Sequence, residues 1–408
     1  MDRLDVVGIP AGGWSELGAS ARTLIGGAEV LLGGRRHLDL VPAEVRGERV
    51  SWPSPLRPAL PGLLDRYADR RTVVLASGDP LVSGIGGTLI DLLGAQAVRI
   101  HPAVSSVALA RARLGWSSET TTVVTVVGRD LGVVRRQLGA GQRLLVLSSG
   151  AHTPNELADL LVDAGYGPSS LTVLADLGTG DETQIETTAE VGLGEVPALN
   201  LVAVECRPAP STRPLGFVPG LPDDAYSHDG QLTKRDLRAS ALARLAPVPG
   251  ELLWDLGAGA GSIAIEWNRT DPRCRAIAVD RTADRAARIT ANAARLGVPC
   301  LQVITADVTE SLDWLPQPDA VFVGGGADLD LLRRCWHLLA PGGRLVGHAV
   351  TVETEQVLIQ AWQAFGGELV RIGVERLEPL GGLHGWKPAR PVVQWAATRA
   401  GAPKRRHL

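Results

Sequence analysis

The stretch "LLWDLGAGAGSIAIEW" (residues 252–267) decides the fold of the C-terminal half of the chain. In it, an apolar run typical of a buried strand is followed at once by Gly257, Gly259 and Gly261, and then by a helix-like pattern. A strand-to-helix turn of this kind presents backbone N–H groups and the positive end of a helix to a polar ligand, and the missing Cβ atoms let that ligand lie against the chain. We expect a Rossmann-like α/β sheet with a ligand-binding loop at this position.

The spacing of the glycines and the acidic residues that follow narrow the ligand. A dinucleotide fingerprint would carry its third glycine at Ser262, so the observed spacing disfavours a dehydrogenase. The next apolar run ends in Asp280, a position from which a carboxylate accepts both hydroxyls of a ribose. The run after it ends in Asp307, which we expect to reach an adenine amino group, and a fourth run opens onto three glycines beginning at Gly324.

This ordered set resembles the class I S-adenosylmethionine-dependent methyltransferases over roughly residues 225–400. The resemblance implies that the segment "HDGQLTKRD" (228–236) covers the cofactor, although Thr233 and Asp236 also have the spacing of a capping box. The glycines from Gly324 onward replace the Asn/Asp-Pro-Pro-aromatic motif with which some members hold base amino groups, so methylation of carbon is expected. The implied cofactor contacts are Gln231, Thr233, Asp255, Gly257, Ala258, Gly259, Ala260, Gly261, Asp280, Ala306, Asp307 and Gly324.

A second glycine-rich loop, "LASGDPLVSGIGG" (75–87), follows an apolar run in the N-terminal half. Together with "VVGIPAGG" (6–13) and "HPAVSSVALARARLGW" (101–116), it resembles the tetrapyrrole methylase family over about residues 3–206. The resemblance implies a two-lobed α/β fold with S-adenosylmethionine bound between the lobes. The implied cofactor contacts are Gly78, Asp79, Gly84, Ile85, Ser105 and Ser106.

The two halves are separated by "CRPAPSTRPLGFVPGLPDD" (206–224), whose five prolines and lack of periodicity are typical of a linker. We therefore expect an N-terminal domain at residues 1–206, a linker at 207–221 and a C-terminal domain at 222–408. Short apolar runs alternate with helical patterns almost throughout both halves, which favours parallel α/β architecture. One helix is marked from Thr153, as N-cap, to a stop at Gly165.

The pairing of these two unlike domains resembles the fused methyltransferases of aerobic cobalamin biosynthesis. The resemblance implies methylation of precorrin-6Y at carbon 5 by the N-terminal domain, and methylation at carbon 15 with loss of carbon dioxide by the C-terminal domain, giving precorrin-8X. Each domain would hold one S-adenosylmethionine, and the chain would form homo-oligomers. Two alternatives stay open: another tetrapyrrole as substrate, or one domain that acts only as a scaffold.

Further candidates follow from the chemistry of such a substrate. Its peripheral carboxylates call for arginine forks or lysines, and its ring for an aromatic partner, although each of these side chains alone also reads as a surface charge or a packing anchor. For the decarboxylation site we consider His348, at the end of an apolar run, and Glu353. The candidate substrate contacts are Arg35, Arg36, Arg129, Trp386, Lys387 and Arg390.

Composition excludes several other classes. The net charge of −3 provides no basic field for nucleic acid, and no apolar run is long enough to cross a bilayer. The N-terminal segment lacks the pattern of a signal peptide, so we expect a cytoplasmic protein. The four cysteines contain no CxxC pair, so neither a metal site nor a disulfide framework is expected.

Overall fold

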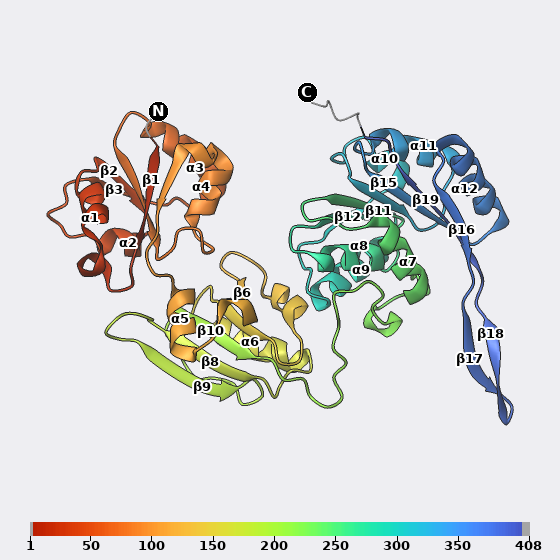
Figure 1. Ribbon diagram of the computed structural model, residues 1–408, viewed down its shortest axis with the longest axis horizontal. Helices are drawn as coiled ribbons and strands as arrows, with labels where there is room; N and C mark the ends of the chain where they lie inside the picture. The colour runs from red at the N-terminus through yellow and green to blue at the C-terminus, as the bar shows by residue number, and fades with distance from the viewer. Residues whose placement is uncertain (1–2, 402–408) are drawn as a thin grey trace. The chain divides into compact units, whose positions relative to one another are not determined.

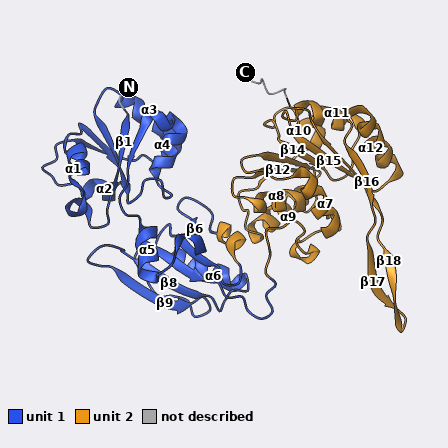
Figure 2. Cartoon of the chain, viewed as in Figure 1, with its two compact units in different colours: residues 1–131, 139–213 blue, residues 132–138, 214–408 orange. Residues whose placement is uncertain are grey.

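The computed structural model describes residues 3–401 of the chain, which divide into two compact units (Figure 2). Unit 1 comprises Met1–Leu131 and Gly139–Arg213, and unit 2 comprises Gly132–Leu138 and Pro214–Leu408. The change of unit at residues 213 and 214 falls inside the proline-rich segment expected as a linker. Seven residues of the N-terminal half, 132–138, lie with unit 2, which the expectation of an uninterrupted N-terminal domain did not include.

Unit 1 begins with a parallel sheet of five strands in the order β3-β2-β4-β1-β5 (Figure 1). Adjacent residues of β1 point to opposite faces, because Val6 packs in one core cluster and Val7 in another. Helices therefore cover both faces. The elements are β1 (Leu4–Ile9), α1 (Ala19–Gly26), β2 (Val30–Gly33), α2 (Arg35–Asp39), β3 (Glu48–Ser51), α3 (Leu56–Arg66), β4 (Thr72–Ser77), α4 (Ile85–Leu93) and β5 (Val98–His101).

The second lobe of unit 1 is a mixed sheet in the order β6-β7-β10-β8-β9. Only the pair β6–β7 is parallel, because β10 lies antiparallel between β7 and β8, so this lobe departs from the expected parallel α/β architecture. The polar strand β9, "TQIETT", carries no apolar run and was not expected. The elements are α5 (Ser106–Leu114), β6 (Thr121–Thr125), β7 (Arg143–Leu147), α6 (Thr153–Asp163), β8 (Ser170–Ala175), β9 (Thr183–Thr188) and β10 (Asn200–Glu205).

The start of α6 differs by one residue from the expectation. His152 is its N-cap and makes no side-chain capping bond, whereas Thr153 lies inside the helix. The Thr153 hydroxyl instead accepts a hydrogen bond from the backbone N–H of Ser149, so it stabilises the preceding turn rather than the helix end. Gly165 follows the helix with a positive φ of 79°, in agreement with the expected stop.

Unit 2 is built on a seven-stranded sheet in the order β13-β12-β11-β14-β15-β19-β16. Its first five strands are parallel, and at one edge β19 pairs antiparallel with both β15 and the outermost strand, β16. A two-stranded hairpin of β17 and β18 extends from this edge (Figure 1). The elements are α7 (Arg235–Leu245), β11 (Leu252–Leu256), α8 (Ser262–Thr270), β12 (Arg275–Asp280), α9 (Ala283–Arg295), β13 (Gln302–Thr305), α10 (Val308–Ser311), β14 (Ala320–Val323), α11 (Leu329–Leu338), β15 (Arg344–Ala349), α12 (Val352–Phe365), β16 (Glu368–Ile372), β17 (Glu375–Leu380), β18 (Leu383–Pro388) and β19 (Val392–Thr398).

The end of the expected linker belongs to the core of unit 2. Leu221 is 4% exposed and packs with α7 and α8 side chains. The backbone N–H groups of Gly220 and Leu221 donate to the carboxylate of Glu266, which also pairs with the fully buried Arg238. The proline-rich composition therefore predicted irregular structure correctly, but this part of the segment is anchored.

The short segment 132–138 also packs within unit 2. Val134 is fully buried, and Nε of Arg136 donates to the backbone carbonyl of Arg269 across 2.9 Å. The guanidinium of Arg136 lies over the ring of Phe217, 5.6 Å from its centroid. These contacts explain why the segment groups with unit 2 although it lies between strands of unit 1 in the sequence.

Within residues 3–401, no helix combines the length and hydropathy needed to span a bilayer. The same residues contain no group of three or more metal-ligating side chains. All four cysteines are free thiols, and three of them, Cys206, Cys274 and Cys335, are buried.

Candidate functional site

The glycine loops of unit 2 meet where the order of the parallel strands reverses. The strand order runs from β11 outward to β12 and β13 on one side and to β14 and β15 on the other. A Cβ added to Gly257, after β11, would lie 3.7 Å from the carbonyl oxygen of Gly325, after β14. The two loops thus face each other at a topological switch point, the position where open α/β sheets bind ligands.

The backbone of the first loop requires glycine at Gly259. Its φ of 59° lies in the left-handed region, and an added Cβ would lie 2.8 Å from the carbonyl oxygen of Gln231. Gly261 closes the turn by donating to the carbonyl of Ala258 across 2.8 Å, and it is the N-cap of α8. The backbone N–H of Ala258 donates to the carbonyl of Val279. The loop is therefore fixed between β12 and the segment that contains Gln231.

Two buried carboxylates support this loop from below. Oδ2 of Asp280 accepts from the N–H of Gly259 at 3.0 Å, and Oδ1 accepts from the N–H of Thr282 at 3.0 Å. Asp255, only 1% exposed, accepts from the N–H of Ala264 in the first turn of α8. Burial and the nearby charge of Asp280 raise the pKa of Asp255 to about 7. Asp280 lies where a ribose-binding carboxylate was expected, and each of its oxygens keeps a second lone pair for a ligand.

The segment before α7 covers the glycine loop, as the contact between Gln231 and Gly259 shows. Asp229 pairs with Arg285 and Arg288 of α9 at 2.9 and 3.2 Å, and these partners lower its pKa. Asn292, 1% exposed, joins the two parts: its amide bonds to both backbone groups of Ser227 and to the carbonyl of Ala260. No motif marked Asn292 in the sequence; its only signal was a polar residue on the apolar face of a helix.

Other predicted contacts of unit 2 lie at the same edge of the sheet but are used locally. Asp307 is exposed and caps α10 by accepting from the N–H of Thr309, and Ala306 donates its N–H to the carbonyl of Asp280. The capping box expected at Thr233 is wrong: α7 begins one residue later, with Lys234 as N-cap and no side-chain capping bond. Thr233 is instead partly buried in the covering segment.

The two candidates for the decarboxylation site have different environments. His348 is 4% exposed in β15, where its Nε2 lies 2.8 Å from Oε1 of Gln394 and its ring meets the edge of Phe322. Burial lowers the pKa of His348 to about 4. Glu353 is exposed in the first turn of α12. The structure thus presents His348 as a neutral, packed side chain and Glu353 as a surface carboxylate, and does not bring them together.

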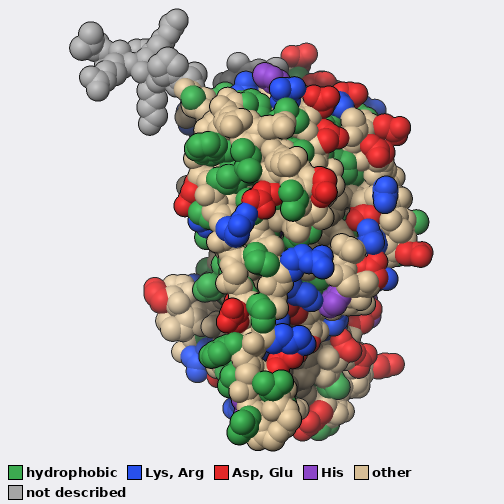
Figure 3. Space-filling model, turned by 90° about the vertical axis from the view of Figure 1, so that its right-hand side faces the viewer, with side chains coloured by type: hydrophobic (Ala, Val, Ile, Leu, Met, Phe, Trp, Pro, Cys, Tyr) green, Lys and Arg blue, Asp and Glu red, His purple; other side chains and the backbone are tan. Residues whose placement is uncertain are grey.

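Trp386, Lys387 and Arg390 lie on or beside the β17–β18 hairpin and not at the glycine loops. Trp386 is 67% exposed opposite Leu377, and Lys387 pairs with Glu378 at 2.8 Å. Figure 3 views unit 2 from the side that carries this hairpin and shows hydrophobic side chains at the surface among charged ones.

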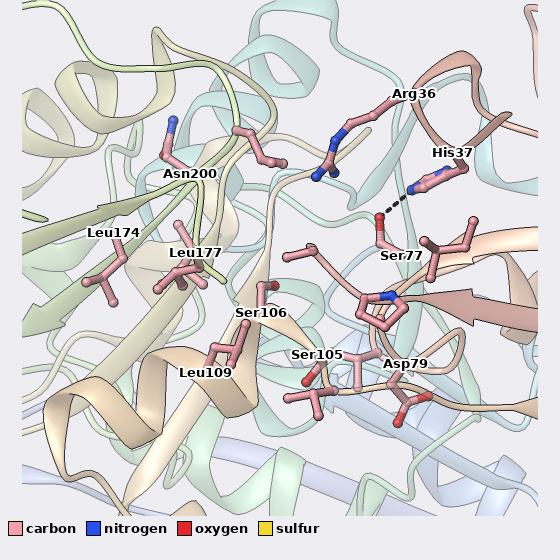
Figure 4. Close-up of a pocket in the computed structure, with 18 of the residues that line it drawn as sticks. Arg36, His37, Ser77, Asp79, Ser105, Ser106, Leu109, Leu174, Leu177 and Asn200 are labelled. Atoms are coloured by element: carbon pink, nitrogen blue, oxygen red, sulfur yellow. Dashed lines mark hydrogen bonds between the residues drawn. The ribbon is translucent and has the colours of Figure 1, made fainter. Parts of the chain in front are cut away.

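The candidate site of unit 1 is a cavity between its two sheets (Figure 4). Gly78, Asp79, Ser105 and Ser106, all predicted from the sequence, line it together with Arg36. Oδ1 of Asp79 accepts from the N–H of Leu81, and the hydroxyl of Ser105 caps α5 by accepting from the N–H of Ala108. The opposite wall, from β8, β10 and α5, is apolar and carries Leu109, Leu174, Leu177 and Leu201.

Four predicted residues of unit 1 lie outside the cavity lining. Gly84 is needed for a tight turn, because an added Cβ would lie 2.6 Å from the carbonyl oxygen of Pro80. Ile85 packs against a core cluster on one face of the first sheet. Arg35 and Arg129 are exposed. The loops that the resemblance named contribute residues to this cavity, but within each loop some residues serve the fold.

Three polar residues of the cavity lining, His37, Ser77 and Asn200, were not among the predictions. Nε2 of His37 lies 2.7 Å from the hydroxyl of Ser77, and Asn200 donates its amide to the carbonyls of Gly150 and Pro197. Among the described residues, neither Nδ1 of His37 nor Oδ1 of Asn200 has a hydrogen-bond partner, although both atoms are buried. Ser77 and Asn200 stand at strand ends that face the cavity, which is the signal that could have identified them.

Both sites fit S-adenosylmethionine by their own chemistry. The unit 1 cavity combines an apolar wall with two buried polar atoms that lack protein partners, as a ligand with both apolar and polar parts requires. In unit 2, Gly325 and Gly326 leave open space for atoms laid against the backbone, and the Asp280 carboxylate is bonded to Gly259 in the facing loop. These residues would hold the cofactor.

Comparisons with known proteins match the two halves of the chain to two different family models. Residues 3–191 match the model of the tetrapyrrole (corrin/porphyrin) methylases, and residues 224–399 match that of the precorrin methyltransferase domain. A Sinorhizobium protein named precorrin-6Y C(5,15)-methyltransferase (decarboxylating) is 44% identical over 97% of this chain and 96% of its own length. A Salmonella typhimurium cobalt-precorrin-7 C(5)-methyltransferase is 32% identical over 44% of this chain and 87% of its own. A probable cobalt-precorrin-6B C(15)-methyltransferase (decarboxylating) of Saccharolobus solfataricus is 29% identical over 36% of this chain and 78% of its own.

Proposed function

The chain belongs to the family of decarboxylating precorrin-6Y C5,15-methyltransferases, and on that premise we propose that it methylates carbons 5 and 15 of precorrin-6Y and removes the ring-C acetate carboxyl group as carbon dioxide. The identity of 44% over nearly the full length of both chains carries this proposal. The proposed reaction is a step of cobalamin biosynthesis, and its product is precorrin-8X.

We assign methylation of carbon 5 to unit 1, and methylation of carbon 15 with decarboxylation to unit 2. Two features support the division: unit 1 has a cavity and unit 2 a pair of facing glycine loops, and the relatives named for a single carbon each cover less than half of this chain. Each unit would then bind one S-adenosylmethionine.

The chain's task in both steps is alignment. When bound, S-adenosylmethionine supplies an electrophilic methyl group, so the protein has to place it in line with the acceptor carbon and exclude water. In unit 2 the covering segment, fixed by Asn292 and by the pairing of Asp229 with Arg285, closes over the glycine loop. In unit 1 the apolar wall with Leu174 and Leu177 would contact the macrocycle, and Arg36 would pair with one of its carboxylates.

The expected homo-oligomer remains part of the proposal. The β17–β18 hairpin exposes the cross-strand pair Leu380 and Leu383, by 70% and 76%, and on its other face the pair Leu377 and Trp386, by 56% and 67%. Exposed apolar side chains of this kind are typical of interaction surfaces. Sedimentation of the full-length chain over a range of concentrations tests this, with Leu383→Asp expected to shift the equilibrium toward the monomer. If Leu383→Asp sediments with the same distribution of species as the wild type, the hairpin does not contribute to the oligomer interface.

The activity itself is tested by mass-resolved turnover of precorrin-6Y with the full-length chain. We expect a product with two added methyl groups and one lost carbon dioxide, and calorimetry is expected to count two S-adenosylhomocysteine sites per chain. A product with a single added methyl group would contradict the two-step reaction. A single binding site would instead make one unit a scaffold.

A further inference from the structure

One corner of the unit 1 cavity contains a hydrogen-bonded pair that the proposed function does not use. His37 lies on α2, and Ser77 is the last residue of β4. Nε2 of His37 and Oγ of Ser77 are 2.7 Å apart, and both residues line the cavity (Figure 4). An exposed serine at a strand end would turn its hydroxyl freely in water, so a histidine held against it fixes the hydroxyl in one orientation.

The surroundings of the ring indicate which atom carries its proton. Nδ1 of His37 is buried and has no partner within residues 3–401, and a Cβ on Gly34 would lie 3.3 Å from it. Buried N–H groups without an acceptor are rarer than buried acceptors without a donor, so we place the proton on Nε2. Nε2–H then donates to Ser77 Oγ, and the Ser77 O–H is left to donate into the cavity.

The cavity that contains this hydroxyl also contains a cation. Arg36 lines the same cavity, and no carboxylate of the described residues forms an ion pair with it. In Figure 4 its guanidinium and the Ser77 hydroxyl lie on one wall, opposite Leu174 and Leu177. Burial and the charge of Arg36 lower the pKa of His37 to about 4, which keeps its ring neutral at neutral pH.

We propose that Arg36 and Ser77 form a carboxylate-binding corner and that His37 is the positioning residue that orients the Ser77 hydroxyl as a donor. An unpaired guanidinium and an O–H donor that line one cavity are together complementary to a carboxylate, which accepts hydrogen bonds at both oxygens. The identity of the ligand rests on the proposed function. The carboxylate is either a peripheral acetate or propionate of the tetrapyrrole, or that of the amino-acid part of the cofactor.

The experiment uses the full-length chain with Ser77→Ala, His37→Leu and His37→Gln. Glutamine can place an amide N–H near the position of Nε2, whereas leucine cannot, so the pair separates orientation of Ser77 from mere filling of space. His152→Leu, at an exposed histidine outside the cavity, is the matched control. The readouts are the KM and kcat for carbon-5 methylation of precorrin-6Y, and the unit 1 affinities for S-adenosylhomocysteine and for 5′-methylthioadenosine, which lacks the amino-acid part.

We expect Ser77→Ala and His37→Leu to weaken one carboxylate ligand about tenfold, as loss of a hydrogen bond to a charged group implies, with kcat within about twofold of wild type. His37→Gln should recover most of the loss. A raised KM for precorrin-6Y identifies the macrocycle as the source, and a weakened S-adenosylhomocysteine complex with unchanged 5′-methylthioadenosine binding identifies the cofactor.

Two results would overturn the inference: no effect of Ser77→Ala on either ligand, or equal impairment by His37→Gln and His37→Leu. Failure of the proposed function is distinguishable, because the wild-type chain would then not methylate carbon 5 at all. The binding measurements with S-adenosylhomocysteine would still decide whether the corner exists.

Discussion

The backbone N–H of Gly259 donates to Oδ2 of Asp280 across 3.0 Å, which ties the glycine loop after β11 to the end of β12. The same glycine lies under the carbonyl of Gln231, so one residue links the sheet, the loop and the segment that covers it. A carboxylate expected to bind a ribose is thereby also a support for the backbone against which the cofactor would lie.

Gly259→Ala is predicted to disrupt this arrangement. Alanine is strained at a φ of 59°, and its Cβ would lie 2.8 Å from the Gln231 carbonyl, which has to move. We expect unit 2 to bind S-adenosylhomocysteine at least about tenfold more weakly in calorimetry, with carbon-15 methylation reduced and carbon-5 methylation kept. Gly373→Ala, where an added Cβ meets nothing within 4 Å, is the control. An unchanged affinity for S-adenosylhomocysteine would show that the Gly259 loop does not bind the cofactor.

Asp255→Asn is predicted to change the pH dependence of stability. The folded pKa of Asp255 is raised to about 7, so its stabilising contribution is fully present below its unfolded value of 3.8 and is lost as the pH rises toward 7. Between pH 5 and pH 7 this group should lower the free energy of unfolding by about 2 kcal/mol. The asparagine variant lacks that loss while it can still accept from Ala264.

Urea unfolding, followed by hydrogen exchange of peptides from β11, measures this for unit 2. The difference in unfolding free energy between variant and wild type is the quantity of interest, because the other titrating groups cancel in it. The unfolding free energy of Asp255→Asn, relative to that of the wild type, should increase as the pH increases from 5 to 7. A difference independent of pH would show that Asp255 is ionised across the whole range.

Glu266 is predicted to be needed for the stability of unit 2. It pairs with Arg238, and both side chains are buried, at 3% and 0% exposed. Glu266→Leu leaves the guanidinium without this partner and should lower the free energy of unfolding by about 3–5 kcal/mol in urea. Adding Arg238→Met should cost less than the sum of the two single changes. Asp330→Asn, in an exposed pair with Arg333, should cost less than about 1 kcal/mol. Additive single effects would contradict the coupling.

The sequence predicted the parts of the fold that repeat a simple pattern. The strands β1, β4, β11 and β14 are buried on both faces and are therefore written as continuous apolar runs. The glycines that follow them leave room for a ligand. Both features can be recognised from the amino-acid sequence alone. The polar strand β9 and the hairpin of β17 and β18 could not be predicted this way, because their stability comes from pairing with a neighbouring strand and not from an apolar pattern.

The residues of the candidate sites also fall into two groups, those that a sequence pattern marks and those that only tertiary contacts bring together. Asp280 is the last residue of β12 and Asp79 lies in the loop after β4, positions that the family resemblances marked in the sequence. His37, Ser77 and Asn292 depend on contacts between elements distant in the sequence: the His37–Ser77 pair joins α2 to β4, and Asn292 joins α9 to Ser227. No local pattern specifies such contacts, and only the folded chain shows them.

Replacing His348, in β15, distinguishes a structural role of this side chain from a catalytic one. Its folded pKa is lowered to about 4, so it contributes stability above its unfolded value of 6.5 that is lost as the pH falls toward 4. His348→Leu removes the hydrogen bond to Gln394 and should lower the free energy of unfolding by about 1–3 kcal/mol at pH 7. From pH 7 to pH 4.5 the wild type loses about 2 kcal/mol that the variant keeps, so the difference in unfolding free energy between them should narrow or close.

Because the ring of His348 is packed and neutral, carbon-15 methylation by His348→Leu at pH 7.5 should stay within about threefold of wild type. This activity is measured by mass spectrometry beside the unfolding curves. A loss of decarboxylation with unchanged stability would instead make His348 a catalytic residue.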